Sequence, residues 1–198
     1  MSTIPDFSIF TVRSPESAIR RGAAEQLRAQ QQIAHFLGAT LSGTYQLDGR
    51  IYETPTTLIP DGPLPACYVY VVRARRPKLL SHEAEAFVTL GISLVWDEYR
   101  DQLGSGDRSC EDFFNCVLGT FSADPGMELC PSGIASRTGA GLAAGATQTG
   151  KGLADRLEDS ETMDFTYGPS KQPDYVTVER ALLVTWSTTV SANTGIPQ

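Results

Sequence analysis

The chain has 198 residues, of which 41% are hydrophobic and 20% charged, a balance typical of globular proteins. Its 16 Lys and Arg against 23 Asp and Glu give a net charge of -7, which is poorly suited to sequence-independent DNA binding. No apolar run approaches the ~20 residues that a membrane-spanning helix needs. Residues 1–10 lack the pattern of a secretory signal. We therefore expect a soluble cytosolic protein, with no membrane partner.

The four cysteines and two histidines do not have the spacing of a zinc site. No C-x-x-C pair occurs, and zinc-binding motifs are commonly built on such pairs. We expect His35 and His82 at the surface. The cysteines are interpreted as small buried hydrophobic residues of a reducing compartment: Cys67, Cys110, Cys116 and Cys130. We predict no metal ligands and no cofactor.

The first predicted element is one long helix over residues 15–37. Ser14 can cap it, Pro15 suits its first turn, and Gly38 suits its end. The stripe expected to face the core is Ile19, Ala23, Leu27, Gln30, Ala34 and Leu37. Side chains spaced for ion pairs on the solvent side are Arg21, Glu25 and Arg28.

A hairpin and four strands are predicted from turn signals and alternation. Asp48-Gly49, between residues 45–47 and 50–52, is a strong hairpin signal. The four strands cover residues 66–72, 87–96, 162–167 and 176–190. Strict alternation in the second places one set of side chains on a buried face: Val88, Leu90, Ile92, Leu94 and Trp96. In the last strand the corresponding set is Leu182, Val184, Trp186, Thr188 and Val190.

A basic cluster follows the strand over residues 66–72. It consists of Arg73, Arg75, Arg76 and Lys78. Two interpretations stay open at this point. The cluster is either a solvated strand end or a charged patch that faces a partner.

The second predicted helix begins near Ser109. Ser109 and Asp112 resemble a capping box, with Asp in place of the usual Glu. Helical spacing places one apolar set on the sheet: Cys110, Phe113, Phe114, Val117, Leu118 and Phe121. The run Asp124-Pro125-Gly126 predicts a sharp end to this helix.

Residues 132–153 are rich in Gly, Ala, Ser and Thr and predict a long loop or insertion. Residues 1–13 form an N-terminal extension. The order of elements and the half-polar strands favour a single α+β domain. Its expected architecture is a mainly antiparallel sheet with two helices packed on one face.

One run resembles a nucleotide-binding motif. Residues 145–151 match the first seven places of a phosphate-binding loop and end in Lys151. The eighth place needs a Ser or Thr hydroxyl to ligate magnesium, and here it is Gly152. Residues 137–144 do not have the pattern of the buried strand that precedes such a loop. We therefore predict no ATP or GTP site.

No residue set predicts catalysis. Ser132 lacks the flanking glycines of a nucleophile elbow. A carboxylate cluster could hold a metal or serve as acid and base, although a solvated turn is the commoner arrangement: Asp97, Glu98, Asp101 and Asp107. Trp96 and Trp186 occupy apolar registers and are expected to pack in a core or an interface. We predict no catalytic residues and a protein that is not an enzyme.

Five features occur in a recognisable order. After the N-terminal helix comes a strand that opens with Leu-Pro-Ala (residues 64–71), then the alternating strand over residues 87–96. A helix ending at Asp124-Pro125 follows, and the chain closes with a strand that contains residues 179–186. This order resembles that of the tail-terminator, or tail-completion, proteins of tailed bacteriophages. The resemblance covers residues 15–190 and departs from the family at residues 1–13 and 132–152.

The resemblance implies a structural virion protein, located at the junction of tail and neck and made in the host cytoplasm. Family members form a ring, usually a hexamer, that caps the completed tail tube and docks to the neck. The implied partners are further copies of this chain, the tail tube protein, neck or connector proteins, and the sheath if the tail is contractile. DNA passes through the ring without specific binding. We expect exposed strand edges and residues 132–152 to form the contacts.

Two alternatives remain open. The chain could be another neck, connector or baseplate component of a phage tail or contractile injection system, because these also use small α+β subunits in rings. It could also be a small ligand-binding module or an enzyme, because one fold hosts many functions.

Overall fold

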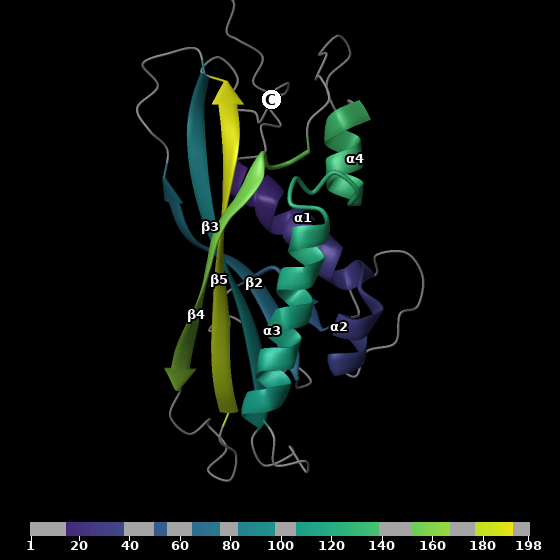
Figure 1. Cartoon of the computed structure of the whole chain (residues 1–198), viewed down its shortest axis with the longest axis vertical. Helices are drawn as coiled ribbons and strands as arrows, with labels where there is room; N and C mark the ends of the chain where they lie inside the picture. The colour runs from purple at the N-terminus through teal and green to yellow at the C-terminus, as the bar shows by residue number, and fades with distance from the viewer. Residues whose placement is uncertain are drawn as a thin grey trace, which may run out of the picture.

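The protein is described by a computed structural model that places the helices and strands of an α+β fold. The described residues are 15–37, 50–54, 65–75, 83–97, 106–138, 152–166 and 177–191. The helices among them all lie on one side of a sheet (Figure 1). The predicted α+β class, with helices on one face of the sheet, is confirmed.

Five strands form the sheet in the order β1-β2-β3-β5-β4. Only β1 and β2 pair in parallel, and all the other neighbours are antiparallel. The strands are β1 (Ile51–Tyr52), β2 (Ala66–Arg75), β3 (Glu83–Asp97), β4 (Arg156–Thr166) and β5 (Thr177–Ser191). The four strands predicted from alternation are therefore present, and each is longer than predicted or shifted by a residue.

The predicted N-terminal helix is two helices, which corrects the expectation of one. They are α1 (Pro15–Ala29) and α2 (Gln31–Phe36). The break is at Gln30, whose backbone is extended, with φ -88° and ψ 115°. Gln is a good helix former, so tertiary packing has overridden local propensity here.

The second long helix, α3 (Gly106–Ala123), begins earlier than predicted. Ser109 is therefore inside the helix, and the predicted capping box with Asp112 is wrong. The predicted end is confirmed, since the helix stops before Asp124. The Asp124 carboxylate then accepts hydrogen bonds from the amides of Glu128 and Leu129, both at 2.9 Å. These bonds hold the turn that leads into the next element.

The Gly/Ala-rich segment is not a loop throughout. A helix, α4 (Pro131–Thr138), occupies its beginning. The rest of the segment, up to Lys151, lies outside the described residues. The N-terminal extension and the first arm of the predicted hairpin also lie outside them. Of that hairpin, the described strand is β1, which pairs with β2.

The main core lies between the sheet and the helices. The predicted faces of β3 and β5 are confirmed, because Leu90, Ile92 and Val184 are fully buried there. Phe113 and Phe121 of α3 cover them, and Phe121 meets Trp186 edge to face with ring centroids 5.0 Å apart. The other buried members of the predicted helix stripes include Ile19, Ala23, Leu27, Phe114 and Val117.

Two glycines allow backbones to approach closely beneath α4. A Cβ atom on Gly133 would lie 1.7 Å from the Met127 carbonyl oxygen. One on Gly152 would lie 1.9 Å from the carbonyl oxygen of Gly126. No side chain fits at either position without moving backbone. The contact at Gly133 holds α4 close to the turn between α3 and α4, and the contact at Gly152 holds the segment before β4 close to the same turn.

Candidate functional site

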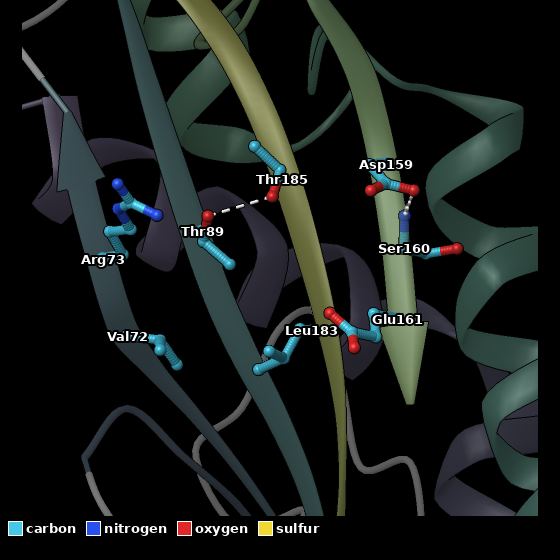
Figure 2. Close-up of a pocket in the computed structure, with 8 residues that line it drawn as sticks. All are labelled: Val72, Arg73, Thr89, Asp159, Ser160, Glu161, Leu183 and Thr185. Carbon is cyan, nitrogen blue, oxygen red and sulfur yellow. Dashed lines mark hydrogen bonds between the residues drawn. The ribbon is translucent and has the colours of Figure 1, made fainter. Parts of the chain in front are cut away.

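The candidate site is on the face of the sheet opposite the described helices, which we call the outer face. It carries the residues that alternate with the core-facing set along each strand, including Tyr70, Thr89, Gly91, Leu183 and Thr185. A hollow of about 250 Å³ lies on this face. Four strands contribute its lining, shown in Figure 2: Val72, Arg73, Thr89, Asp159, Ser160, Glu161, Leu183 and Thr185.

Hydroxyl groups form the centre of the outer face. The Thr89 and Thr185 side chains share a hydrogen bond, with their oxygens 2.9 Å apart (Figure 2). The Tyr70 ring lies over Gly91, where a Cβ atom would be 2.7 Å from the ring. The Tyr70 hydroxyl reaches Ser93 Oγ at 3.0 Å. The middle of this face is therefore closely fitted and mainly polar, with Leu183 as its large aliphatic side chain.

The strands on either side of this centre, β2 and β4, each have a register shift at the same height of the sheet. The register of β2 shifts between Val71 and Arg73, and that of β4 shifts between Leu157 and Asp159. Arg73 pairs with Thr89, and Asp159 pairs with Thr185, so the two charged residues end one transverse row. Bulges of this kind occur near sheet edges and re-aim side chains. The row therefore has a cation at one end and an anion at the other.

The charges continue along both flanking strands. On β2, Val72 is 48% exposed, and Arg73 and Arg75 are also exposed. On β4, the exposed acidic residues are Glu158, Asp159 and Glu161. Between described residues, neither Arg73 nor Glu161 forms an ion pair. The hollow thus lies between a basic strand end and an acidic strand.

Arg156 is the one basic side chain on the described part of β4, and it is held locally. Its Nε donates to Glu158, and its Nη2 lies 3.7 Å from Glu85 Oε1 on β3. The nearby Ser187 hydroxyl and then Arg156 lower the pKa of Glu158, while Glu158 raises that of Arg156. Both groups stay charged near neutral pH, and their mutual neutralisation leaves Asp159 and Glu161 to set the sign of this strand.

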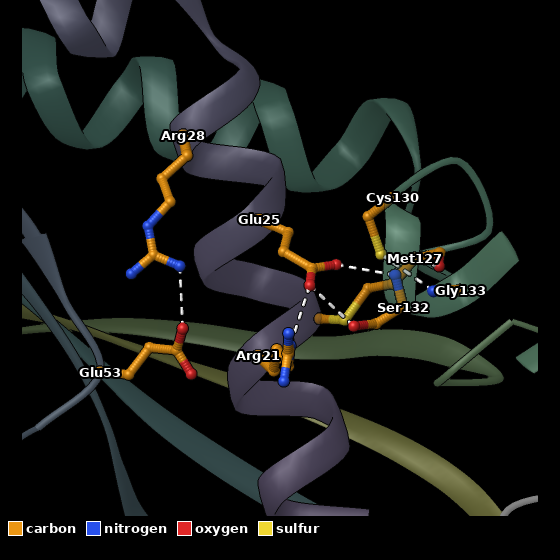
Figure 3. A network of polar contacts seen from close by, with 8 residues as sticks. All are labelled: Arg21, Glu25, Arg28, Glu53, Met127, Cys130, Ser132 and Gly133. Atoms are coloured by element: carbon orange, nitrogen blue, oxygen red, sulfur yellow. Dashed lines mark hydrogen bonds and ion pairs between the residues drawn. The ribbon is translucent and has the colours of Figure 1, made fainter. Parts of the chain in front are cut away.

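A second polar cluster, beneath α4, is structural (Figure 3). Glu25 is 7% exposed, and its carboxylate accepts hydrogen bonds from the amide and the hydroxyl of Ser132, both at 2.8 Å. Arg21 Nε donates to the same carboxylate at 3.0 Å. The predicted Arg21–Glu25 pair therefore exists, but the expectation that Glu25 faces solvent is wrong because α4 docks over it. Its charge caps the first turn of α4 from another helix.

Arg28 was also expected on the solvent side and is instead buried. Its Nη1 donates to Glu53 Oε1 at 2.8 Å (Figure 3). Its Nη2 donates to the Ile51 carbonyl, also at 2.8 Å. A buried guanidinium that is paired in this way ties α1 to β1. The cluster holds elements together.

The cysteines behave mainly as buried apolar residues. Cys67, Cys110 and Cys130 are buried, as expected, whereas Cys116 is partly exposed. Burial raises the pKa of Cys67 and of Cys130 to about 12. The Cys130 thiol also donates to the Met127 carbonyl at 3.3 Å (Figure 3). Neither thiol is ionised near neutral pH, so neither is a nucleophile there.

Most of the other candidate residues lie outside the part of the chain that the structure describes. His35 is exposed on α2, and His82 lies outside the described residues. The carboxylates of Asp97, Glu98, Asp101 and Asp107 cannot be placed together, since their side chains all lie outside what is described. Within the described ranges, no group of three or more His, Cys, Asp or Glu is placed to hold a metal ion.

The phosphate-loop match leads into a strand. Gly152 is buried and is followed by β4, whereas a phosphate loop opens a helix. Position 152, where the motif needs a Ser or Thr hydroxyl, has no room for a side chain, because a Cβ atom there would lie 1.9 Å from the Gly126 carbonyl oxygen. Ser132 is committed to Glu25. Trp186 lies in the core and Trp96 packs at its margin.

The row of Arg73, Thr89, Thr185 and Asp159 was missed by the sequence reasoning. Only Arg73 was singled out, as part of the basic cluster, and the interpretation as a partner-facing patch stays open. The acidic run at residues 158–161 was the signal that could have completed the row. None of the helices described here is long and apolar enough to cross a membrane.

The sequence was compared with protein-family models and with curated proteins, and neither comparison gave a match.

Proposed function

We propose that this chain is a structural virion protein that forms a ring, caps the completed tail tube of a phage and joins it to the neck. The proposal starts from the element order that resembles the tail-terminator family. The observation that carries it is the difference between the two faces of the sheet. The described helices all pack on one face, and the outer face has a polar centre flanked by strands with charged side chains.

The outer face suits contact with a protein better than it suits a small molecule. Small-molecule pockets typically enclose ~300–1,000 Å³ and are mostly apolar. The hollow here is about 250 Å³, and charged and hydroxyl side chains form most of its lining. A non-obligate protein interface is on the whole about as polar as the rest of the protein surface. The geometry therefore favours the ring subunit over the ligand-binding alternative.

The experiment is end-capping of tail tubes. The purified chain is added to growing tubes of the tail-tube protein from the same virus, and tube length and end density are measured by negative-stain electron microscopy. We expect a ring with a central hole at one tube end and no further growth there. The control is an equal amount of unfolded chain.

Two results would contradict the proposal. One is unchanged tube growth with no density at the ends, even at a large excess of chain. The other is a ring that binds the portal or neck proteins but not the tube. The second result would favour the alternative of another neck or connector component.

A further inference from the structure

The two long edges of the described sheet have opposite charge. The β2 edge ends in Arg73 and Arg75, and the β4 edge carries Asp159 and Glu161. Among the described strands, β4 has a neighbour only on its β5 side. On its far side, β2 is paired by β1 only at Cys67 and Tyr68. The basic half of β2 and the whole of β4 therefore lack a second described strand.

The strand directions fit these two edges to each other. Each step from β2 through β3 and β5 to β4 is antiparallel, so β2 and β4 run in opposite directions. A second copy in the same orientation, placed beside β4, brings its β2 alongside β4 in the antiparallel sense. Antiparallel pairing is also what the rest of the sheet uses. No inversion of the second copy is needed.

The charges fall at matching heights. Arg73 and Asp159 stand in one transverse row across the sheet, on the outer face. A neighbouring copy without stagger brings Arg73 opposite Asp159, but it also brings Arg75 opposite Arg156. A stagger of two residues instead places Arg73 opposite Glu161 and Arg75 opposite Asp159, so that an acidic residue faces each arginine.

We propose that β4 of one copy pairs antiparallel with the basic half of β2 of the next copy, and that Arg73 and Arg75 meet Asp159 and Glu161 there. This inference rests on the proposed ring and names its subunit contact. It uses two different edges, so the contact is head to tail. Head-to-tail contacts close into rings when the rotation between copies allows it.

The same charges exclude the wrong pairings. Two β4 edges would bring acidic residues together, and two β2 edges would bring arginines together, so a two-fold dimer through either edge is opposed. Each exposed ion pair contributes little to the stability of the contact. The backbone hydrogen bonds between the strands therefore hold the contact, and the charges select which edges meet. The bulges in both strands also limit indiscriminate pairing.

The test reverses each edge separately and then mixes the products. The basic edge is reversed by Arg73→Glu with Arg75→Glu, and the acidic edge by Asp159→Lys with Glu161→Lys. The matched control for the acidic edge is Glu111→Lys with Asp112→Lys, which makes the same charge change as that variant at exposed positions of α3. Circular dichroism checks folding, and light scattering with negative-stain microscopy measures assembly across a wide range of protein concentration.

We expect each edge variant alone to associate at least about tenfold more weakly than the natural chain, while the control assembles normally. A 1:1 mixture of the two edge variants should recover assembly, because every contact then joins an acidic edge to a basic one. The mixed ring must alternate the two chains, so it contains equal numbers of each and an even total number of copies. Recovery should weaken as salt is raised.

The outcomes separate this inference from the proposed function. If the natural chain forms a ring and both edge variants form it equally well, the edges are not the contact and the ring proposal stands. If the mixture assembles into open filaments or dimers, the edge contact stands and the ring proposal fails. If neither the natural chain nor the mixture associates at any concentration, the edge contact is overturned, and end-capping of tubes tests the function by itself.

Discussion

The two faces of the sheet are built from the same strands but by different physical means. On the face beneath the helices, Leu90 and Ile92 are fully buried with Phe113 and other apolar side chains. On the outer face, Thr89 bonds Thr185, and Tyr70 covers Gly91. Burial of apolar area stabilises the first face. The second face holds exposed charges and half-buried hydroxyls at its centre, and we expect these groups to contribute little to stability.

The sharpest test of this contrast is a cavity on the covered face. Leu90→Ala should lower the free energy of unfolding by about 2–5 kcal/mol, because Leu90 is fully buried and its neighbours can relax only partly. Urea unfolding followed by circular dichroism measures the change. A loss below about 1 kcal/mol would mean that this face is not closely packed.

A smaller loss is expected where backbones meet beneath α4. Gly152→Ser completes the phosphate-loop pattern but places a Cβ atom 1.9 Å from the Gly126 carbonyl oxygen. We expect destabilisation of about 1–3 kcal/mol, since the chain must move to accept the side chain. Urea unfolding measures it, and equilibrium dialysis with ATP and magnesium should show no binding. A stable variant that binds ATP would contradict both this geometry and the expectation of no nucleotide site.

Cys67, which is buried on the covered face, should also make the free energy of unfolding fall at alkaline pH. Burial raises the pKa of its thiol from 9.0 to about 12, so the folded chain keeps a proton that the unfolded chain loses. The stabilisation is complete below pH 9 and declines as pH rises toward 12. This single group should lower the free energy of unfolding by about 1.4 kcal/mol per pH unit within that window.

Urea unfolding from pH 8 to pH 11 measures this slope, and Cys67→Val provides the control. The variant keeps an apolar side chain of similar size but cannot ionise, so its slope should be smaller by the contribution of Cys67. An equal slope in both proteins would contradict the assignment. Cys130 and Tyr68 contribute slopes of the same sign, because burial raises their pKa values also to about 12.

The contrast between the faces also explains what the sequence could predict. Side chains alternate along a strand, so the pattern from Val88 to Leu94 identified the buried set without knowledge of strand order. The helix stripes around Leu27 and Phe113 were likewise recognisable from spacing alone. Hydrophobic periodicity in the sequence indicates which side chains are buried, and burial of apolar side chains is what stabilises the face beneath the helices.

Features that depend on distant contacts could not be predicted in this way. Glu25 looked like a surface residue because its partner Ser132 is 107 positions away. The row that joins Arg73 to Asp159 depends on strand order and on two bulges, and neither leaves a periodic signal. The break at Gln30 has no local cause, since Gln favours helices. The candidate site was missed for the same reason.

The smallest expected effect is on the outer face itself. Thr89→Val keeps the branched shape suited to a strand but removes the hydroxyl that meets Thr185 at 2.9 Å. Both side chains are only half-buried, so water can replace the lost partner, and we expect a stability change within about 0.5 kcal/mol. Urea unfolding alongside Leu90→Ala, the adjacent residue on the covered face, makes the comparison within one strand. A loss above about 1.5 kcal/mol for Thr89→Val would mean that this hydroxyl pair is desolvated like a core contact. The outer face would then contribute to folding as the covered face does, and its charged edges would have to be explained by the stability of the single chain before any contact between copies.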